Sequence, residues 1–139
     1  MKRGAEQALA GVPLFEGLTK AQLRSVMEAT VEVAYDAGES IAGEGMLAVD
    51  FYLILDGEAE VVTGGEHLAS LGPGDHFGEL AVIDGEPRSA TVRATTRLRA
   101  LRLVADDFQR LLRTTPELAY RILVEAVRRL RASPPPPTA

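Results

Sequence analysis

The amino-acid sequence predicts a mainly β fold, with short strands in the middle of the chain and helices at both ends. Between residues 31 and 103, runs rich in Val, Ile, Leu and Tyr alternate with turn signals such as Gly72-Pro73-Gly74. Regular short strands separated by frequent turns are typical of a sandwich or barrel. One helical pattern precedes this region and two follow it. We therefore expect a β-barrel or jelly roll with one N-terminal and two C-terminal helices.

The strands are predicted from short apolar or alternating runs. These are VEVAY (31–35), DFYLIL (50–55), EAEVV (58–62), HLASL (67–71), SATVRA (89–94) and LRALRLV (98–104). Asp56-Gly57 separates the second run from the third and is the strongest hairpin signal in the chain, because such a turn needs positive φ. We therefore expect these two runs to form a hairpin.

Capping signals and apolar periodicity predict the helices. Thr19 and Gln22 form a capping-box pattern ahead of apolar residues at helical spacing. Residues 105–113 predict a short helix, and Thr115-Pro116 then opens the last one, with Thr as cap and Pro at the first helical position. The last helix has one broad apolar face, made of Leu118, Ala119, Ile122, Leu123, Ala126, Val127 and Leu130.

The composition indicates a soluble globular protein with a single domain over residues 1–132 and a stiff proline-rich tail over 133–139. No apolar run reaches the about 18 residues that a membrane span needs, so we expect a cytoplasmic protein with no direct membrane contact. The net charge of −5 argues against a nucleic-acid partner. The absence of cysteine excludes disulfides and thiolate metal sites.

Catalytic and metal-site patterns are weak. His67 and His76 are nine residues apart and match no metal-binding spacing. His76 follows Asp75 beside a glycine turn, so we expect it to be a solvated loop residue. The serines have neither a G-x-S-x-G context nor a nearby base. The sequence therefore predicts a protein that is not an enzyme and has no metal or cofactor.

The stretch DHFGELAVIDGEPRSATVRA, residues 75–94, favours binding of a nucleotide. A helical turn after Gly78 would offer free N–H groups to an anion, and Arg88 offers a charged fork that matches phosphate oxygens. Glu79 would repel a phosphate, but it can accept a hydrogen bond from a ribose hydroxyl. The segment lacks the lysine motif of triphosphate sites and suits a single negative charge. An alternative is a simple ion pair between Glu79 and Arg88, with Phe77, Leu80, Val82 and Ile83 as core residues.

FGELAVIDGEPRSATV, residues 77–92, resembles the phosphate-binding cassette of the cyclic nucleotide-binding domain superfamily, whose pattern is F-G-E-[LI]-A followed by [PT]-R-[AST]-A. The resemblance extends over residues 12–131 and implies an eight-stranded β-roll that binds cAMP or cGMP. It implies that Glu79 accepts from the ribose 2′-hydroxyl and that Arg88 holds the cyclic phosphate. The amides of Gly78, Ala81 and Ser89 would assist, and Phe77, Leu80, Val82 and Ala90 would form the pocket wall.

The same resemblance implies a lid, because an arginine at the position of Arg129 contacts the purine in related channel domains. We expect the last helix to close over the ligand and cAMP to be favoured, although Ser89 would also permit cGMP. The chain is then either a free-standing sensor or the regulatory domain of a larger channel or transporter, with its effector unknown. A homodimer is compatible with both. The remaining alternative is an interaction module that kept the shape of the cassette without its ligand.

Overall fold

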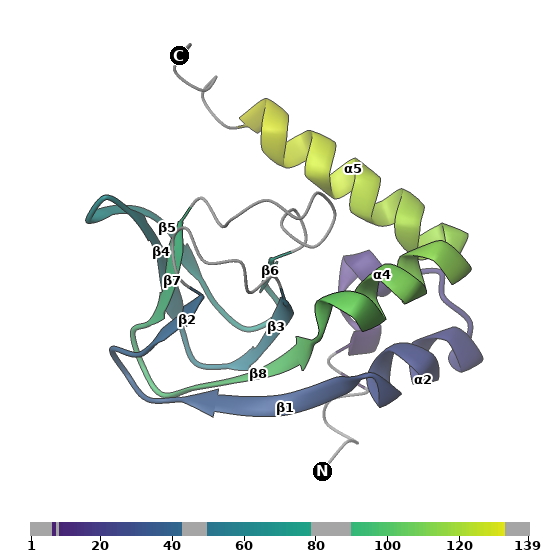
Figure 1. Ribbon diagram of the computed structural model, residues 1–139, viewed down its shortest axis with the longest axis horizontal. Coiled ribbons are helices and arrows are strands. Elements are labelled where there is room, and N and C mark those ends of the chain that lie inside the picture. Colours follow the sequence, from purple (N-terminus) through teal and green to yellow (C-terminus); the bar gives the residue numbers. More distant parts are fainter. Residues whose placement is uncertain (1–6, 8, 43–49, 79–89, 133–139) are drawn as a thin grey trace.

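The computed structural model describes residues 7, 9–42, 50–78 and 90–132 and has eight strands in this part of the chain (Figure 1). They form two four-stranded sheets, which we call sheet A (order β1-β8-β3-β6) and sheet B (order β2-β7-β4-β5), and all described pairings are antiparallel. The strands are β1 Thr30–Tyr35, β2 Ser40–Ala42, β3 Phe51–Asp56, β4 Ala59–Thr63, β5 Glu66–Leu71, β6 His76–Phe77, β7 Thr91–Ala94 and β8 Leu98–Leu103. The predicted mainly β fold is confirmed.

Helices lie at both ends of the roll, as predicted: η1 (Pro13–Phe15) and α2 (Lys20–Glu28) come before it, and α4 (Ala105–Thr114) and α5 (Pro116–Ala132) come after it. The predicted capping box is present, because Gln22 N donates to Thr19 Oγ1 at 3.1 Å and Thr19 N donates to Gln22 Oε1 at 2.9 Å. Among the described residues, no helix is long and apolar enough to cross a membrane.

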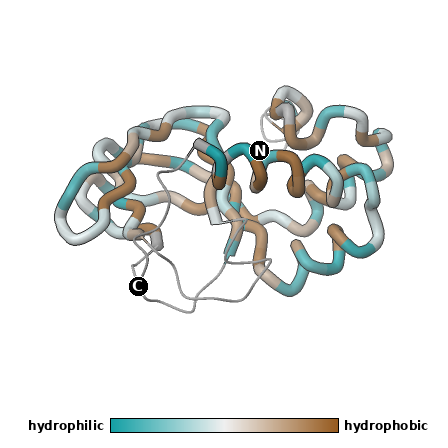
Figure 2. The backbone as a smooth tube through the Cα atoms, turned by 90° about the horizontal axis from the view of Figure 1, so that it is seen from above, coloured by the Kyte–Doolittle hydropathy of each residue, from teal (hydrophilic) through white to brown (hydrophobic). Residues whose placement is uncertain are grey.

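Sheet A separates two apolar cores. On one face, its residues join the helices in a helical core made of Leu9, Val12, Leu14, Phe15, Val26, Met27, Phe51, Leu53, Leu101, Leu103, Phe108, Leu111, Leu118 and Ile122. On the other face, they join sheet B in a roll core made of Tyr52, Ile54, Ala59, Phe77, Val92, Ala94, Leu98 and Ala100. Apolar residues therefore run through the strand half and the helical half of the molecule alike (Figure 2).

Helix α4 is attached to sheet A by a residue far away in the sequence. Its N-cap residue, Val104, has no capping side chain. Asp50, just before β3, takes this role: its Oδ1 accepts from Ala105 N at 3.1 Å and its Oδ2 accepts from Arg102 Nε at 2.7 Å. The hydrogen bond from Arg102 to Asp50 raises the pKa of Arg102. One carboxylate thus ties the start of β3, the end of β8 and the start of α4 together.

The predicted hairpin at Asp56-Gly57 is wrong. β3 belongs to sheet A and β4 to sheet B, so this turn is a corner between the sheets. The Asp56-Gly57 pattern correctly indicated a turn, and Gly57 has a positive φ of 90°. Which strands pair with each other, however, depends on segments that are distant in the sequence. A tight hairpin instead joins β4 to β5 through Gly64 and Gly65, whose φ angles are 56° and 84°. Two positive φ values are what such a two-residue turn requires.

The broad apolar face predicted for the last helix is present, but the rest of the chain covers only part of it. Leu118 and Ile122 are buried, with 0% and 2% of their surfaces exposed. Leu123, Val127 and Leu130 are exposed by 59%, 40% and 68%. Apolar periodicity shows that a face is apolar, but it does not show whether another element covers it.

Replacement of Gly57 by alanine is expected to destabilise the fold more than the same change at Gly38. Both glycines have φ near 90°, so each change carries the left-handed penalty of about 1–2 kcal/mol. A Cβ at Gly57 would also lie 2.2 Å from Arg97 O and 2.8 Å from Leu98 Cα, whereas a Cβ at Gly38 meets nothing within 4 Å. Overpacking typically costs about 1–3 kcal/mol more. Urea denaturation of both variants measures the difference, and equal losses would contradict the close contact.

Candidate functional site

The candidate site begins at β6, the edge strand of sheet A. β6 pairs with β3 through Tyr52 opposite Phe77 and Leu53 opposite His76. The ring of Phe77 is 5% exposed and stacks on Tyr52 with centroids 5.0 Å apart and an interplanar angle of 15°. Phe77 therefore contributes to the roll core immediately before the cassette-like segment.

Gly78 follows with φ at 99°, a value that favours glycine. The segment 79–89 then leads to Ala90 and β7, so it connects sheet A to sheet B. Most of the predicted site residues lie in that segment, outside the described residues: Glu79, Leu80, Ala81, Val82, Arg88 and Ser89. The described part provides the frame on either side of them, and their roles stay predictions.

The frame next to this segment is apolar, with the hydroxyl groups of two tyrosines beside it. Val92 of β7 and Phe77 of β6 both belong to the roll core. Tyr52 forms a side-chain hydrogen bond with Tyr35, and Tyr35 packs against the same core. Burial raises the pKa of the Tyr52 phenol, and the interactions with Tyr35 raise it further. Tyr52 therefore stays neutral at physiological pH and takes part as a hydrogen-bonding group.

His76 is not the solvated loop residue that the sequence predicts. It lies in β6, is 9% exposed, and its ring centroid is 5.4 Å from that of Phe51. Because successive strand residues face opposite sides, His76 is turned to the helices and Phe77 to the roll. The glycine turn before His76 favours a loop, and a strand of two residues is too short to show an alternating pattern.

A groove of about 500 Å³ separates α5 from the turn before β6. Gly74, Asp75 and His76 line one side of it, and residues of α5 such as Arg121 and Arg128 line the other. Arg121 Nε donates to Glu117 Oε2 at 3.0 Å within the helix. α5 and β6 thus face one another across this groove, which we call the α5 groove.

Position 129 belongs to α5, and its side chain lies outside what the structure describes. It follows Ile122 by seven residues, so two helical turns bring the two positions to the same face of the helix. That face is the one on which Ile122 is buried. The contact between Arg129 and a purine remains a prediction.

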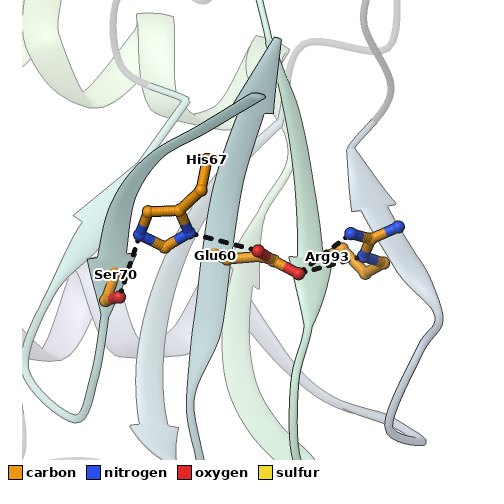
Figure 3. A network of polar contacts seen from close by, with 4 residues as sticks. All are labelled: Glu60, His67, Ser70 and Arg93. Carbon is orange, nitrogen blue, oxygen red and sulfur yellow. Dashed lines mark hydrogen bonds and ion pairs between the residues drawn. The ribbon is translucent and has the colours of Figure 1, made fainter. Parts of the chain in front are cut away.

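A polar network that the sequence did not reveal crosses the outer face of sheet B (Figure 3). Glu60 of β4 accepts from Arg93 Nη2 at 2.9 Å, and its other oxygen lies 3.2 Å from His67 Nδ1. Ser70 Oγ is 3.4 Å from the second ring nitrogen of His67. The hydrogen bonds with His67 and Arg93 lower the pKa of Glu60. The pairing of β4 with β5 and β7 brings these residues together, since Glu60 lies opposite Ser70 and opposite Arg93. The described residues hold no group of three or more His, Cys, Asp or Glu that could bind a metal.

A family profile described as "Cyclic nucleotide-binding domain" matches residues 32–115. The chain belongs to the cyclic nucleotide-binding domain family. The two sheets form the β-roll of that family, and the helices flank this roll. The matched region includes β6, the segment 79–89 and β7.

Relatives of this domain include regulatory parts of larger proteins. The cyclic nucleotide-gated potassium channel RHE_CH03180 of Rhizobium etli is 40% identical over 129 residues, which are 93% of this chain and 36% of the channel. The cAMP-dependent protein kinase regulatory subunit of Schizosaccharomyces pombe is 43% identical over 77% of this chain and 26% of the subunit. The regulatory domain of Toxoplasma gondii PKA, solved with cAMP, superposes with a TM-score of 0.72 at 31% identity, over 79% of this chain and 44% of that one. This chain therefore spans about a third or less of the curated relatives named here.

Proposed function

We propose that this chain is a cyclic nucleotide sensor that binds cAMP in preference to cGMP and closes α5 over the bound ligand. One observation carries the proposal. The segment with the cassette-like sequence, 79–89, begins and ends beside the roll core, between Phe77 and Val92. A ligand held by this segment would lie against an apolar wall on one side and could be covered by a helix on the other. Such a site is concave and mostly apolar, with a few polar groups that fix orientation.

The charged groups of the ligand are bound by the cassette residues. Arg88 holds the cyclic phosphate with its guanidinium fork, and Glu79 accepts from the ribose 2′-hydroxyl. The amides of Gly78, Ala81 and Ser89 assist at the phosphate, while Phe77, Leu80, Val82 and Ala90 form the wall. The positive φ of Gly78 and the burial of Phe77 support the first steps of this assignment.

The preference for cAMP is supported by relatives. The Schizosaccharomyces pombe relative is named as a cAMP-dependent regulatory subunit, and the Toxoplasma gondii domain was solved with cAMP. Ser89 supplies a hydroxyl next to Arg88 that would also suit a guanine amino group. Titration of the protein with cAMP and cGMP by calorimetry tests the order, and tighter binding of cGMP would reverse it.

The output of the domain is regulation rather than catalysis, in the cytoplasm. The channel of Rhizobium etli, related to this chain over 93% of its length, favours a second form of the proposal, in which the domain regulates a larger channel. A module that kept the cassette shape without a ligand would bind neither nucleotide in the titration.

The lid is supported by the arrangement of α5. This helix runs past β6 (Figure 1), and residues of both line the α5 groove. A nucleotide base needs cover that the cassette does not provide. Movement of α5 toward the roll would bring position 129 to the base, where an arginine adds stacking or cation–π contact.

Replacement of Arg88 by alanine is expected to weaken cAMP binding by about 2–5 kcal/mol, because the buried phosphate loses its charged partner. This corresponds to a loss of at least about tens-fold in affinity. Arg93→Ala is the matched control, since Arg93 pairs with Glu60 on the outer face of sheet B. Calorimetry on both folded variants decides the point. Unchanged affinity in Arg88→Ala would show that the phosphate is held by another residue.

Replacement of Glu79 by alanine is expected to remove a charge-assisted hydrogen bond worth about 1.5–3 kcal/mol. The same variant should lose far less affinity for 2′-deoxy-cAMP, which lacks the hydroxyl. The two ligands and the two proteins form a cycle that isolates this one contact. Equal losses for both ligands would indicate that Glu79 pairs with Arg88 instead.

Replacement of Arg129 by alanine is expected to weaken binding by about 0.5–2 kcal/mol, the range of a cation–π contact. Arg113→Ala serves as the control, because Arg113 lies exposed on α4 outside the α5 groove and should matter little. Hydrogen exchange of α5 should slow when cAMP binds. Identical affinities for the two variants, or identical exchange with and without cAMP, would refute the lid.

A further inference from the structure

We propose that β1 is a contact surface for a second copy of this chain, whose own β1 adds to it antiparallel and joins the two copies of sheet A into one continuous sheet. β1 is an edge strand, because sheet A has the order β1-β8-β3-β6. An edge strand presents unpaired backbone N–H and C=O groups to whatever lies beside it. No described strand pairs with the outer side of β1.

β1 lacks the features that block such pairing at the other described edge strands. β6 has only two residues, and β2 has three residues and an irregular register. β5 contains a bulge at Leu68, which has no residue opposite it in β4. Short strands and bulges are the usual devices that prevent pairing between sheet edges. β1, by contrast, has six residues and pairs with β8 without interruption from Thr30 to Tyr35.

The outer edge of β1 is accessible and carries no unpaired charge. The strand lies along the border of the molecule (Figure 1), and Val31 is 57% exposed. Glu32 and Ala34 are exposed as well. Glu32 is the only charged residue of β1, and its Oε2 accepts from Arg99 Nη1 of the neighbouring strand at 2.9 Å. A charged side chain is a further device that blocks edge pairing, and here its charge is already compensated.

Symmetry and charge select one register for two copies of β1. A two-fold antiparallel pair sets one residue opposite its own copy, and the contact closes on itself. Only two centres pair five residues of each strand: Glu32, which pairs residues 30–34, and Val33, which pairs residues 31–35. A pair centred on Glu32 would place two carboxylates directly opposite each other, and like charges in this position destabilise a sheet. The register is therefore centred on Val33.

The side chains of this register fit a second copy. Val31 lies opposite Tyr35 of the second copy, twice, and Glu32 lies opposite Ala34 of the second copy. Aromatic and β-branched residues form favourable cross-strand pairs. Val33 and Tyr35 already pack against the roll core of their own chain, whereas Val31, on the same side of the strand, is left exposed. The second copy would cover Val31 and extend this apolar row from one chain into the other.

The contact is small, because six residues of a strand span about 20 Å. It belongs to the smaller class of interfaces, whose association is weak and transient. We therefore expect a dimer that forms with rising protein concentration and dissociates on dilution. β1 and β6 are at opposite edges of sheet A, so the pairing does not rest on nucleotide binding at the cassette-like segment beside β6, and it is tested without nucleotide.

Disulfide trapping tests the contact and its register, because the chain contains no cysteine of its own. Val33→Cys should crosslink with itself under mild oxidation, since this residue lies opposite its own copy. Val31→Cys should not, because its two copies would be offset by about 13 Å along the strands, beyond the reach of a disulfide. Random collision would give the reverse order, because Val31 is exposed and Val33 is half-buried. Crosslinking of Val31→Cys in preference to Val33→Cys would overturn the proposal.

Sedimentation equilibrium of the whole chain measures the association without crosslinks. Val31→Lys should weaken the dimer by about tenfold or more, because a lysine on an edge strand blocks pairing. Leu68→Lys is the matched control: it also replaces an exposed apolar residue of an edge strand, but on β5, and should leave the association unchanged. Circular dichroism checks that both variants fold. A wild-type protein that remains monomeric at every concentration, or an equal effect of the two lysines, would refute the pairing through β1.

Discussion

Everything else in this fold depends on the burial of the central strand of sheet A, β3, on both of its faces. Along β3, Phe51 and Leu53 enter the helical core, whereas Tyr52 and Ile54 enter the roll core. β8 alternates in the same way, with Leu101 on the helical side and Ala100 on the roll side. Residues 51–54 of β3 are all buried, so no side chain in this part of the sheet can turn to solvent to relieve a displacement. Close packing therefore makes each core sensitive to the position of the other.

β6 lies between the α5 groove and the start of the cassette-like segment. His76 contacts Phe51 and lines the α5 groove, and Phe77 stacks on Tyr52 beside the cassette. Two residue pairs join this strand to β3, so it is held by fewer pairings than its neighbours in sheet A. β6 therefore joins the cassette-like segment to the α5 groove through two adjacent side chains.

The sequence predicted what local interactions decide. The capping box of Thr19 and Gln22 needs four consecutive residues, and every predicted strand run overlaps a strand of the structure. The misses depend on contacts between distant segments. Asp56-Gly57 shows a turn but cannot show that β3 and β4 enter different sheets, and His76 is buried by Phe51, 25 positions earlier. For the site, the cassette motif predicts where a ligand would bind. The stack of Phe77 on Tyr52 joins two residues 25 positions apart, and no local pattern signals it.

The crossings between the sheets explain why the site is built where it is. The four crossings that the structure describes in full, at 36–39, 57–58, 72–75 and 95–97, span two to four residues each. Short crossings are fixed by the strands they join: Gly57 has no room for a Cβ, and Glu58 N is held by Thr96 Oγ1 at 3.0 Å. The passage from β6 to β7 is much longer and begins at Gly78, where positive φ lets the chain leave the sheet. Loops that rigid strands hold at both ends are where binding residues concentrate. In the proposed function, a long crossing beside an apolar core would give the domain a place for a ligand without loosening the sheets that position it.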